Sequence, residues 1–148
     1  MKNGKVESIY QNGDKFIGEW KNDLKEGKGK YTLKDSSYYE GDYSNNERHG
    51  FGIMKMPSGG IYKGNFRNGK YNGMGKFTWS DGRYYKGEFK DSKKHGKGKL
   101  VKTSGDILEG IWNEGQRSKD FTFTHNGKAT YLGNNFQLVL EKEDINFK

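Results

Sequence analysis

Three histidines are the side chains in this sequence best suited to acid–base catalysis or transition-metal binding, since the chain has no cysteine. His49 and His95 lie 46 residues apart, each directly before a glycine, at equivalent positions of the repeat described below. A metal site needs several donors within a few ångströms, and two equivalent turns separated by a whole repeat cannot supply them. We therefore expect no catalytic residue, no metal site and no cofactor, and the chain is predicted not to be an enzyme.

Two other patterns resemble ligand sites only superficially. The acidic cluster of Glu141, Glu143 and Asp144 could attract a cation, but no EF-hand loop surrounds it, and a solvated acidic tail is the favoured interpretation. The Gly-Lys-Gly-Lys stretches at 27–30 and 96–99 lack the Lys-Ser/Thr pair and the helix that a phosphate-binding loop requires. Their glycines belong to a repeat instead.

The composition excludes a large aliphatic core. The chain has 148 residues, a net charge of +8, 23 glycines and a single proline, and Leu, Ile, Val and Phe make up under a fifth of it. Such values are typical of disordered chains. An aromatic content of 15% and a regular glycine spacing argue against disorder. No apolar run is long enough to span a membrane, and the first residues have no secretory h-region.

A period of 23 residues runs through most of the chain. A series of single glycines keeps it without a slip, as does a series of Gly-x-Gly pairs. An aromatic residue stands two positions after each of the first five single glycines, and an aromatic residue or leucine stands two positions before all six. The single glycines are Gly18, Gly41, Gly64, Gly87, Gly110 and Gly133; the pairs begin at Gly27, Gly50, Gly73 and Gly96.

Each repeat is predicted to form two short strands and two turns. Phe16, Gly18 and Trp20 alternate with polar residues, so they share one face of a strand. Residues 27–33 alternate in the same way, and Ser-, Asp- and Gly-rich stretches mark the turns. Glycine inside a strand weakens it unless something needs the space. We expect an aromatic ring to cover the slot that each strand glycine leaves.

The motif resembles the MORN repeat (membrane occupation and recognition nexus). Its fullest copy runs through Tyr62-Lys-Gly64-Asn-Phe66, Asn72-Gly73-Met-Gly75-Lys-Phe77 and Asp81-Gly82. The resemblance covers roughly residues 3–135 and implies an all-β fold, an elongated and twisted single antiparallel sheet of stacked β-hairpins. It also implies a structural or scaffolding role, often near membranes or the cytoskeleton, with catalysis in other domains where the family includes enzymes.

The repeat divides the chain into unequal units. We expect a half unit at 1–15, four near-complete units at 16–38, 39–61, 62–84 and 85–107, and degenerate units at 108–130 and 131–135. Terminal units of repeat arrays commonly degenerate because they cap the open end. The remaining 136–148 is a tail or cap, a last strand or a short helix.

Strand alternation predicts two different faces. Seven basic residues of the third and fourth units fall opposite the rings, and these two units each carry +4, from five basic and one acidic residue and from seven and three. The predicted basic face is Lys63, Arg67, Lys76, Lys86, Lys90, Lys97 and Lys99. The predicted aromatic face is Trp20, Tyr39, Tyr43, Tyr62, Phe66, Tyr85, Phe89 and Trp112. The basic side chains could equally serve only to keep a thin sheet soluble.

Several functions remain open at this level. The favoured one is a non-catalytic scaffold or spacer that binds other proteins, through acidic segments on the basic face or through the aromatic face, in a cytoplasmic assembly of the cytoskeleton or a membrane such as a ciliary axoneme or the cell cortex. A single sheet leaves its apolar face to be covered by a partner, by a second copy in a homodimer, or by its own twist. The alternative is binding of anionic phospholipid headgroups by the basic face. Nucleic acid is not expected, since rings and lysines are predicted on opposite faces.

Overall fold

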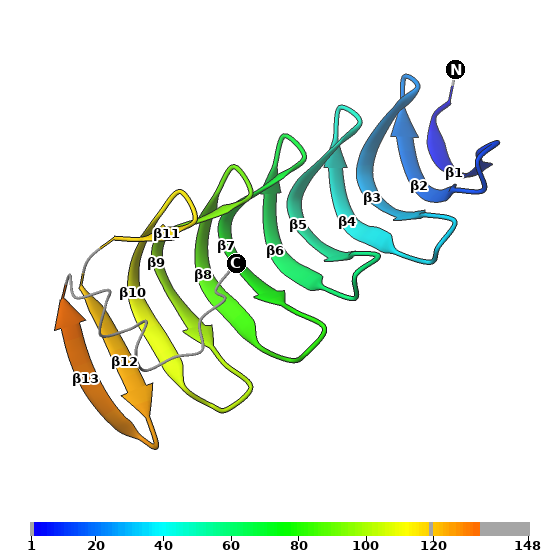
Figure 1. Cartoon of the computed structure of the whole chain (residues 1–148). Coiled ribbons are helices and arrows are strands. Elements are labelled where there is room, and N and C mark those ends of the chain that lie inside the picture. The colour runs from blue at the N-terminus through cyan, green and yellow to red at the C-terminus, as the bar shows by residue number, and fades with distance from the viewer. Residues whose placement is uncertain (1, 119, 134–148) are drawn as a thin grey trace.

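A computed structural model, which describes residues 2–118 and 120–133, folds into one open antiparallel sheet of 13 strands (Figure 1). Consecutive strands pair in chain order, except that the short β11 pairs with β10 beside the main path. The described residues contain no helix. The strands are β1 Gly4–Ile9, β2 Lys15–Lys21, β3 Leu24–Thr32, β4 Tyr38–Ser44, β5 Glu47–Lys55, β6 Ile61–Arg67, β7 Lys70–Thr78, β8 Tyr84–Lys90, β9 Lys93–Val101, β10 Ile107–Asn113, β11 Gln116–Arg117, β12 Phe121–His125 and β13 Lys128–Gly133.

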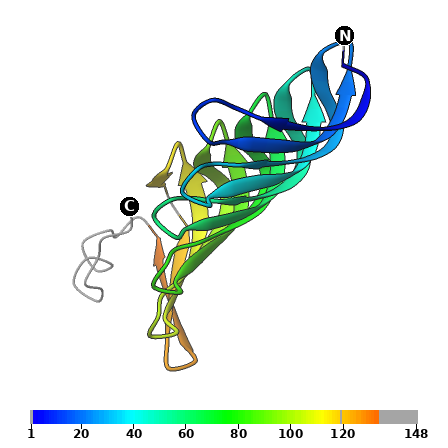
Figure 2. The same cartoon turned by 90° about the vertical axis from the view of Figure 1, so that its right-hand side faces the viewer.

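The predicted all-β, elongated, twisted single sheet is confirmed. Figure 1 shows the hairpins side by side along one axis, and Figure 2 shows that they form a single twisted layer. Each near-complete repeat contributes one seven-residue and one nine-residue strand, as in β6 and β7. β1 pairs with β2 through Val6 and Gly18, in the place that the second strand of a preceding repeat would take.

The register brings strand glycines opposite one another. Gly64 of β6 pairs with Gly75 of β7, and Tyr62 pairs with Phe77. A Cβ atom on Gly64 would lie 2.5 Å from the Gly75 Cα and 2.7 Å from the Tyr62 hydroxyl. Such distances are far below van der Waals contact. The expectation that a ring covers the strand glycines is therefore confirmed, and one ring covers a cross-strand pair.

The covering tyrosine is also fixed by its hydroxyl. Tyr39, Tyr62 and Tyr85 each donate a hydrogen bond to the backbone carbonyl three residues later, at 2.7, 2.8 and 2.8 Å. Each carbonyl belongs to the strand residue that follows the single glycine. The ring thus lies flat along its own strand, and its polar atom is satisfied although the ring is buried.

The first glycine of each Gly-x-Gly pair has a different role from the second. Gly96 has a φ of 82°, and the pairing of β8 with β9 shifts between Gly87 and Phe89, so this glycine lies in a β-bulge. The Glu88 carboxylate accepts a hydrogen bond from the Lys97 amide at 2.7 Å across the bulge. The alternation of glycines with aromatic residues predicts both glycines as packing positions. The first of them instead supplies a left-handed backbone that other residues rarely adopt.

The buried rings form one continuous chain across the repeats. Within a unit Tyr62 meets Phe66 edge to face at 5.1 Å, and between units Tyr39 meets Phe66 at 5.0 Å and Tyr62 meets Phe89 at 5.2 Å. Such pairs contribute about 0.5–1.5 kcal/mol each beyond their burial. Within this chain the rings of neighbouring repeats therefore cover most of one another's surface.

The repeat breaks down at the carboxyl end of the described chain. Leu108 is too short to cover Gly110, and the Phe121 ring covers it instead, with its Cδ1 atom 2.8 Å from a Cβ placed on that glycine. The pairing of β12 with β13 shifts between Phe121 and Thr122, so Tyr131 of β13 pairs with Thr122 and not with the buried Phe123. Tyr131, which the period places at the ring position of a sixth unit, is 66% exposed. The predicted tail 136–148 lies outside the described residues.

Substitution of Gly87 by valine should test the covering of glycine pairs. A Cβ there would lie 2.5 Å from the Lys97 carbonyl oxygen, which belongs to the backbone and cannot move aside cheaply. We expect Gly87→Val to lower the free energy of unfolding by about 1–3 kcal/mol or more. Lys90→Val, at an exposed position of the same strand, is the matched control and should change it little. Equal thermal shifts for the two variants would contradict the packing account.

The buried tyrosines should make the fold sensitive to alkali. Burial raises the pKa of Tyr39, Tyr62 and Tyr85 well above the ordinary value of 10.0. The folded state therefore keeps phenol protons that the unfolded state releases, so stability is fully present below about pH 10 and falls as the pH rises further. We expect tyrosinate absorbance to rise cooperatively with the loss of circular dichroism. Ionisation of all ten tyrosines in a sheet that stays folded would refute this.

Candidate interaction surfaces

The eight predicted aromatic-face residues form a floor. All of them face the same side of the sheet and are at most 8% exposed. They pack against one another and against the strand glycines, so little of their own surface is left for a partner. What a partner could touch is the set of side chains that stand above this floor.

A second tier of half-buried side chains, which are not part of the predicted aromatic face, stands above the floor. It packs against the buried cluster and comes mostly from the second strand of each repeat. Its main members are Tyr31, Met54, Tyr71, Phe77 and Trp79. Tyr71 stacks on Tyr62 with ring centroids 3.9 Å apart. The repeat pattern contains a signal for them, because residues paired across strands share a face, as Phe77 and Tyr85 do.

The aromatic face also carries cations, which corrects the expectation that rings and basic side chains lie on opposite faces. Lys25, Arg48 and Lys94 are half-buried and pair across the strands with Trp20, Tyr43 and Phe89. The register shift at each bulge brings them inward. Their cationic groups lie over the rings: Lys25 is 5.3 Å from Trp20, Arg48 is 5.6 Å from Phe66, and Lys94 is 5.2 Å from Trp112.

These cations recur at the repeat period. Lys2, Lys25 and Arg48 are 23 residues apart, Tyr71 takes the next place, and Lys94 and Arg117 follow. We call the side chains of Lys2, Lys25 and Arg48 the cation row. Burial lowers the pKa of Lys25, and the charge of Lys2 lowers it further. Burial likewise lowers the pKa of Lys94, with smaller effects of Arg117 and Arg83.

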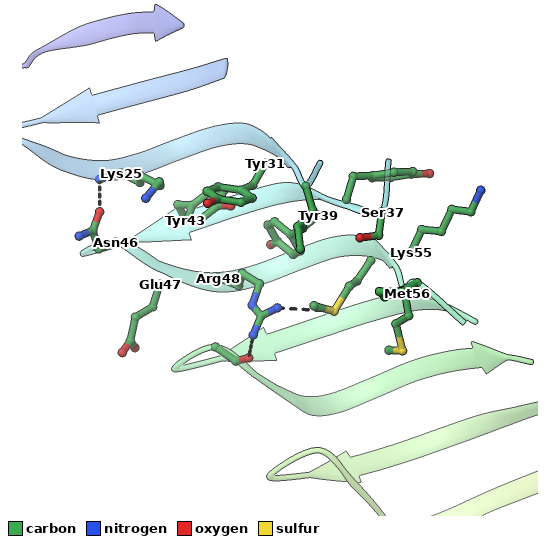
Figure 3. Close-up of a pocket in the computed structure, with 15 residues that line it drawn as sticks. Lys25, Tyr31, Ser37, Tyr39, Tyr43, Asn46, Glu47, Arg48, Lys55 and Met56 are labelled. Carbon is green, nitrogen blue, oxygen red and sulfur yellow. Dashed lines mark hydrogen bonds between the residues drawn. The ribbon is translucent and has the colours of Figure 1, made fainter. Parts of the chain in front are cut away.

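Two hollows open between the tiers. The first, about 480 Å³, lies over β3, β4 and β5 and is bordered by Lys25, Tyr31 and Arg48 (Figure 3). Arg48 is held there by a hydrogen bond from its Nη2 atom to the Gly69 carbonyl oxygen at 2.6 Å. The second, about 430 Å³, is bordered by Tyr71, Trp79 and Lys94. Both have apolar walls and a cation at the edge, which suits a segment with apolar and acidic groups. We call this surface the aromatic groove.

The seven predicted basic-face residues do lie on the opposite face. Six are exposed and Lys99 is half-exposed. The strand register shows which of these lysines are direct neighbours: Lys63 pairs with Lys76, Lys76 with Lys86, and Lys86 with Lys99. Four lysines thus stand directly side by side on four neighbouring strands, and we call them the lysine row. Like charges directly opposite one another destabilise a sheet.

Two of the three histidines have polar partners in the structure. His125 contacts the Asp106 carboxylate at 2.6 Å, and the His95 Nδ1 atom accepts a hydrogen bond from the Glu114 amide at 3.4 Å. Across residues 2–118 and 120–133, no three His, Asp or Glu side chains are grouped as metal ligands would be. Glu141, Glu143 and Asp144 lie outside this part of the chain. No helix in the described residues has the length and apolar character needed to cross a bilayer.

Comparison with known proteins agrees with this architecture. Among solved structures, a similar one is the TCP domain of SAS-4 (dCPAP) from Drosophila melanogaster, in complex with a proline-rich motif of Ana2 (dSTIL). It is 15% identical, with a TM-score of 0.54 over 86% of this chain and 70% of that one. No curated protein matches the chain. The MORN repeat model matches residues 16–38, 39–61, 62–82 and 85–107. With these four matches and the hairpin array that they build, the chain belongs to the MORN repeat family.

Proposed function

We propose that this chain is a non-catalytic scaffold or spacer that binds a segment of a partner protein in the aromatic groove. One observation carries the proposal: the groove keeps half-buried rings and cations above a floor that is already fully packed. The buried floor residues alone would be a sufficient core for a sheet whose only requirement was stability. The additional tier offers a surface in which aromatic and Arg or Lys side chains are combined, as in many binding interfaces.

The repeat architecture supports this role. Strands stacked along one axis give an extended surface, and such repeat proteins commonly use it to bind other chains. The Drosophila domain with a similar fold holds a proline-rich motif, which is consistent with docking of an extended segment on a sheet of this kind. MORN repeats commonly occur in membrane or cytoskeletal assemblies, so we place this chain in such an assembly, for example a ciliary axoneme or the cell cortex.

Photocrosslinking in cells should locate the binding surface. We expect p-benzoylphenylalanine in place of Trp79 or Met56, which border the two hollows, to give adducts with the same protein. The matched controls are Phe51 and Met74, apolar residues that are each 55% exposed on the opposite face. They should give no such adduct. Adducts from the control positions alone, or from none of the four, would overturn groove binding.

The lysine row supports a second candidate function, attachment to an anionic membrane surface. Four lysines in a line across adjacent strands cost stability when nothing neutralises them. Each lysine close to an anionic bilayer contributes about 1 kcal/mol of attraction. In this arrangement the groove faces away from the membrane and remains open to a protein, so the two functions are compatible.

Vesicle sedimentation should test membrane attachment. Lys63→Glu with Lys86→Glu should reduce pelleting with phosphatidylserine vesicles at least about tenfold, since two reversed charges lower the net charge of one site by four units. Lys21→Glu with Lys30→Glu, an equal charge change on the same face of the first unit, should reduce it much less. Equal losses of pelleting in the two double variants would mean that the whole basic surface attracts the vesicles and that the lysine row is not a local site. Pelleting that persists in high salt would contradict an electrostatic site.

A further inference from the structure

The cation row places three positively charged side chains on the aromatic face at the repeat period of the sequence. Lys2, Lys25 and Arg48 are 23 residues apart in the sequence. The ammonium groups of Lys2 and Lys25 lie 4.5 and 5.3 Å from the centroid of the same ring, Trp20, and the Arg48 guanidinium lies 5.6 Å from that of Phe66. The ion pairs found in the described residues include none of these three side chains. Their charges are oriented by rings and hydrogen bonds but are not neutralised by a carboxylate.

The spacing of the row follows from the sheet. Neighbouring strands are about 4.8 Å apart, so one repeat of two strands advances about 9.6 Å. A polyproline II helix advances about 3.1 Å per residue with three residues per turn, or about 9.3 Å per turn. Every third side chain of such a helix lies on the same side. The advance per turn of such a helix therefore nearly equals the advance of the sheet backbone per repeat, which carries one residue of the cation row.

Other chain conformations fit the row less well. In a β-strand, residues three apart point to opposite faces, and residues two apart are only about 6.6 Å apart. In an α-helix the matching interval is close to seven residues, and the helix is about 10–12 Å wide. Polyproline II segments, by contrast, are recognised in aromatic-lined grooves, because they are preformed and lose little entropy on binding.

We propose that the aromatic groove binds a polyproline II segment of a partner protein with an acidic residue at every third position, one carboxylate over each of Lys2, Lys25 and Arg48. The proposal rests on the proposed function and specifies its partner. Charge complementarity and the matching period decide in favour of this occupant. The prolines pack on Tyr31, Met54 and the other half-buried groups of the second tier.

Two peptides of equal length and composition test the spacing. One consists of Glu-Pro-Pro triplets, and the other has all its glutamates in one block followed by all its prolines. We expect the triplet peptide to bind the full chain at least about tenfold more tightly in calorimetry, since only its carboxylates match the repeat. Equal affinity for the two peptides, or no binding of either, overturns the proposal.

Substitutions then locate the bound peptide. Lys25→Gln and Arg48→Gln should each weaken binding of the triplet peptide about fivefold to tenfold. Lys30→Gln and Lys63→Gln, on the opposite face, are the controls and should leave it unchanged. Arg48 also holds the Gly69 carbonyl, so Arg48→Lys serves as a second variant that keeps the charge. Arg48→Lys should retain most of the affinity for the triplet peptide. If Lys30→Gln or Lys63→Gln weakens binding and the row variants do not, the peptide does not bind at the cation row.

The peptide experiment and the crosslinking experiment together distinguish failure of this inference from failure of the proposed function. If Trp79 and Met56 still give a protein adduct while the triplet peptide fails, the groove binds a partner of other chemistry and only this inference fails. If the adducts are also absent, both fail. A single-stranded oligonucleotide that displaces the triplet peptide and binds more tightly would overturn the inference in favour of nucleic acid.

Discussion

The close contact between one aromatic ring and a pair of glycines on adjacent strands is the constraint on which this structure depends. At Tyr62 the ring lies over both Gly64 and Gly75, at distances that leave no room for a Cβ atom on either. A single sheet has no second layer of secondary structure to bury apolar groups. The sheet solves this by recessing part of its own surface and filling the recess with its own rings.

Further features follow from that contact. The tyrosine hydroxyl reaches a backbone carbonyl of its own strand, so the buried ring leaves no polar atom unsatisfied. The bulge that begins with a left-handed glycine resets the register beside the ring, and an acidic side chain bonds an amide across it at Glu19 and at Glu88. Repetition of these contacts joins the rings edge to face from Phe16 to Phe121.

The two faces place positive charge in different physical settings. On the aromatic face Lys25 and Lys94 lie over rings and are partly desolvated, so a carboxylate that reaches them binds in a region of low dielectric. On the opposite face the lysine row is hydrated and its field is screened by salt. The first setting favours a specific, oriented ligand, and the second favours an extended anionic surface. A thin sheet can present both because its faces are independent of each other.

The sequence by itself determined the fold, because the 23-residue period, the alternation around Gly64 and the turn residues all encode local geometry. It also determined which face the rings occupy and that Lys63, Lys76, Lys86 and Lys99 lie opposite them, because side chains alternate strictly along a strand. Only the tertiary structure decided that the predicted aromatic residues are almost fully buried, because burial depends on how strands curve toward one another. The inward position of Lys25, Arg48 and Lys94 likewise depends on a register shift at each bulge, and Tyr131 faces outward because of the shift at Phe121. Register is a relation between strands, and no spacing within one strand contains it.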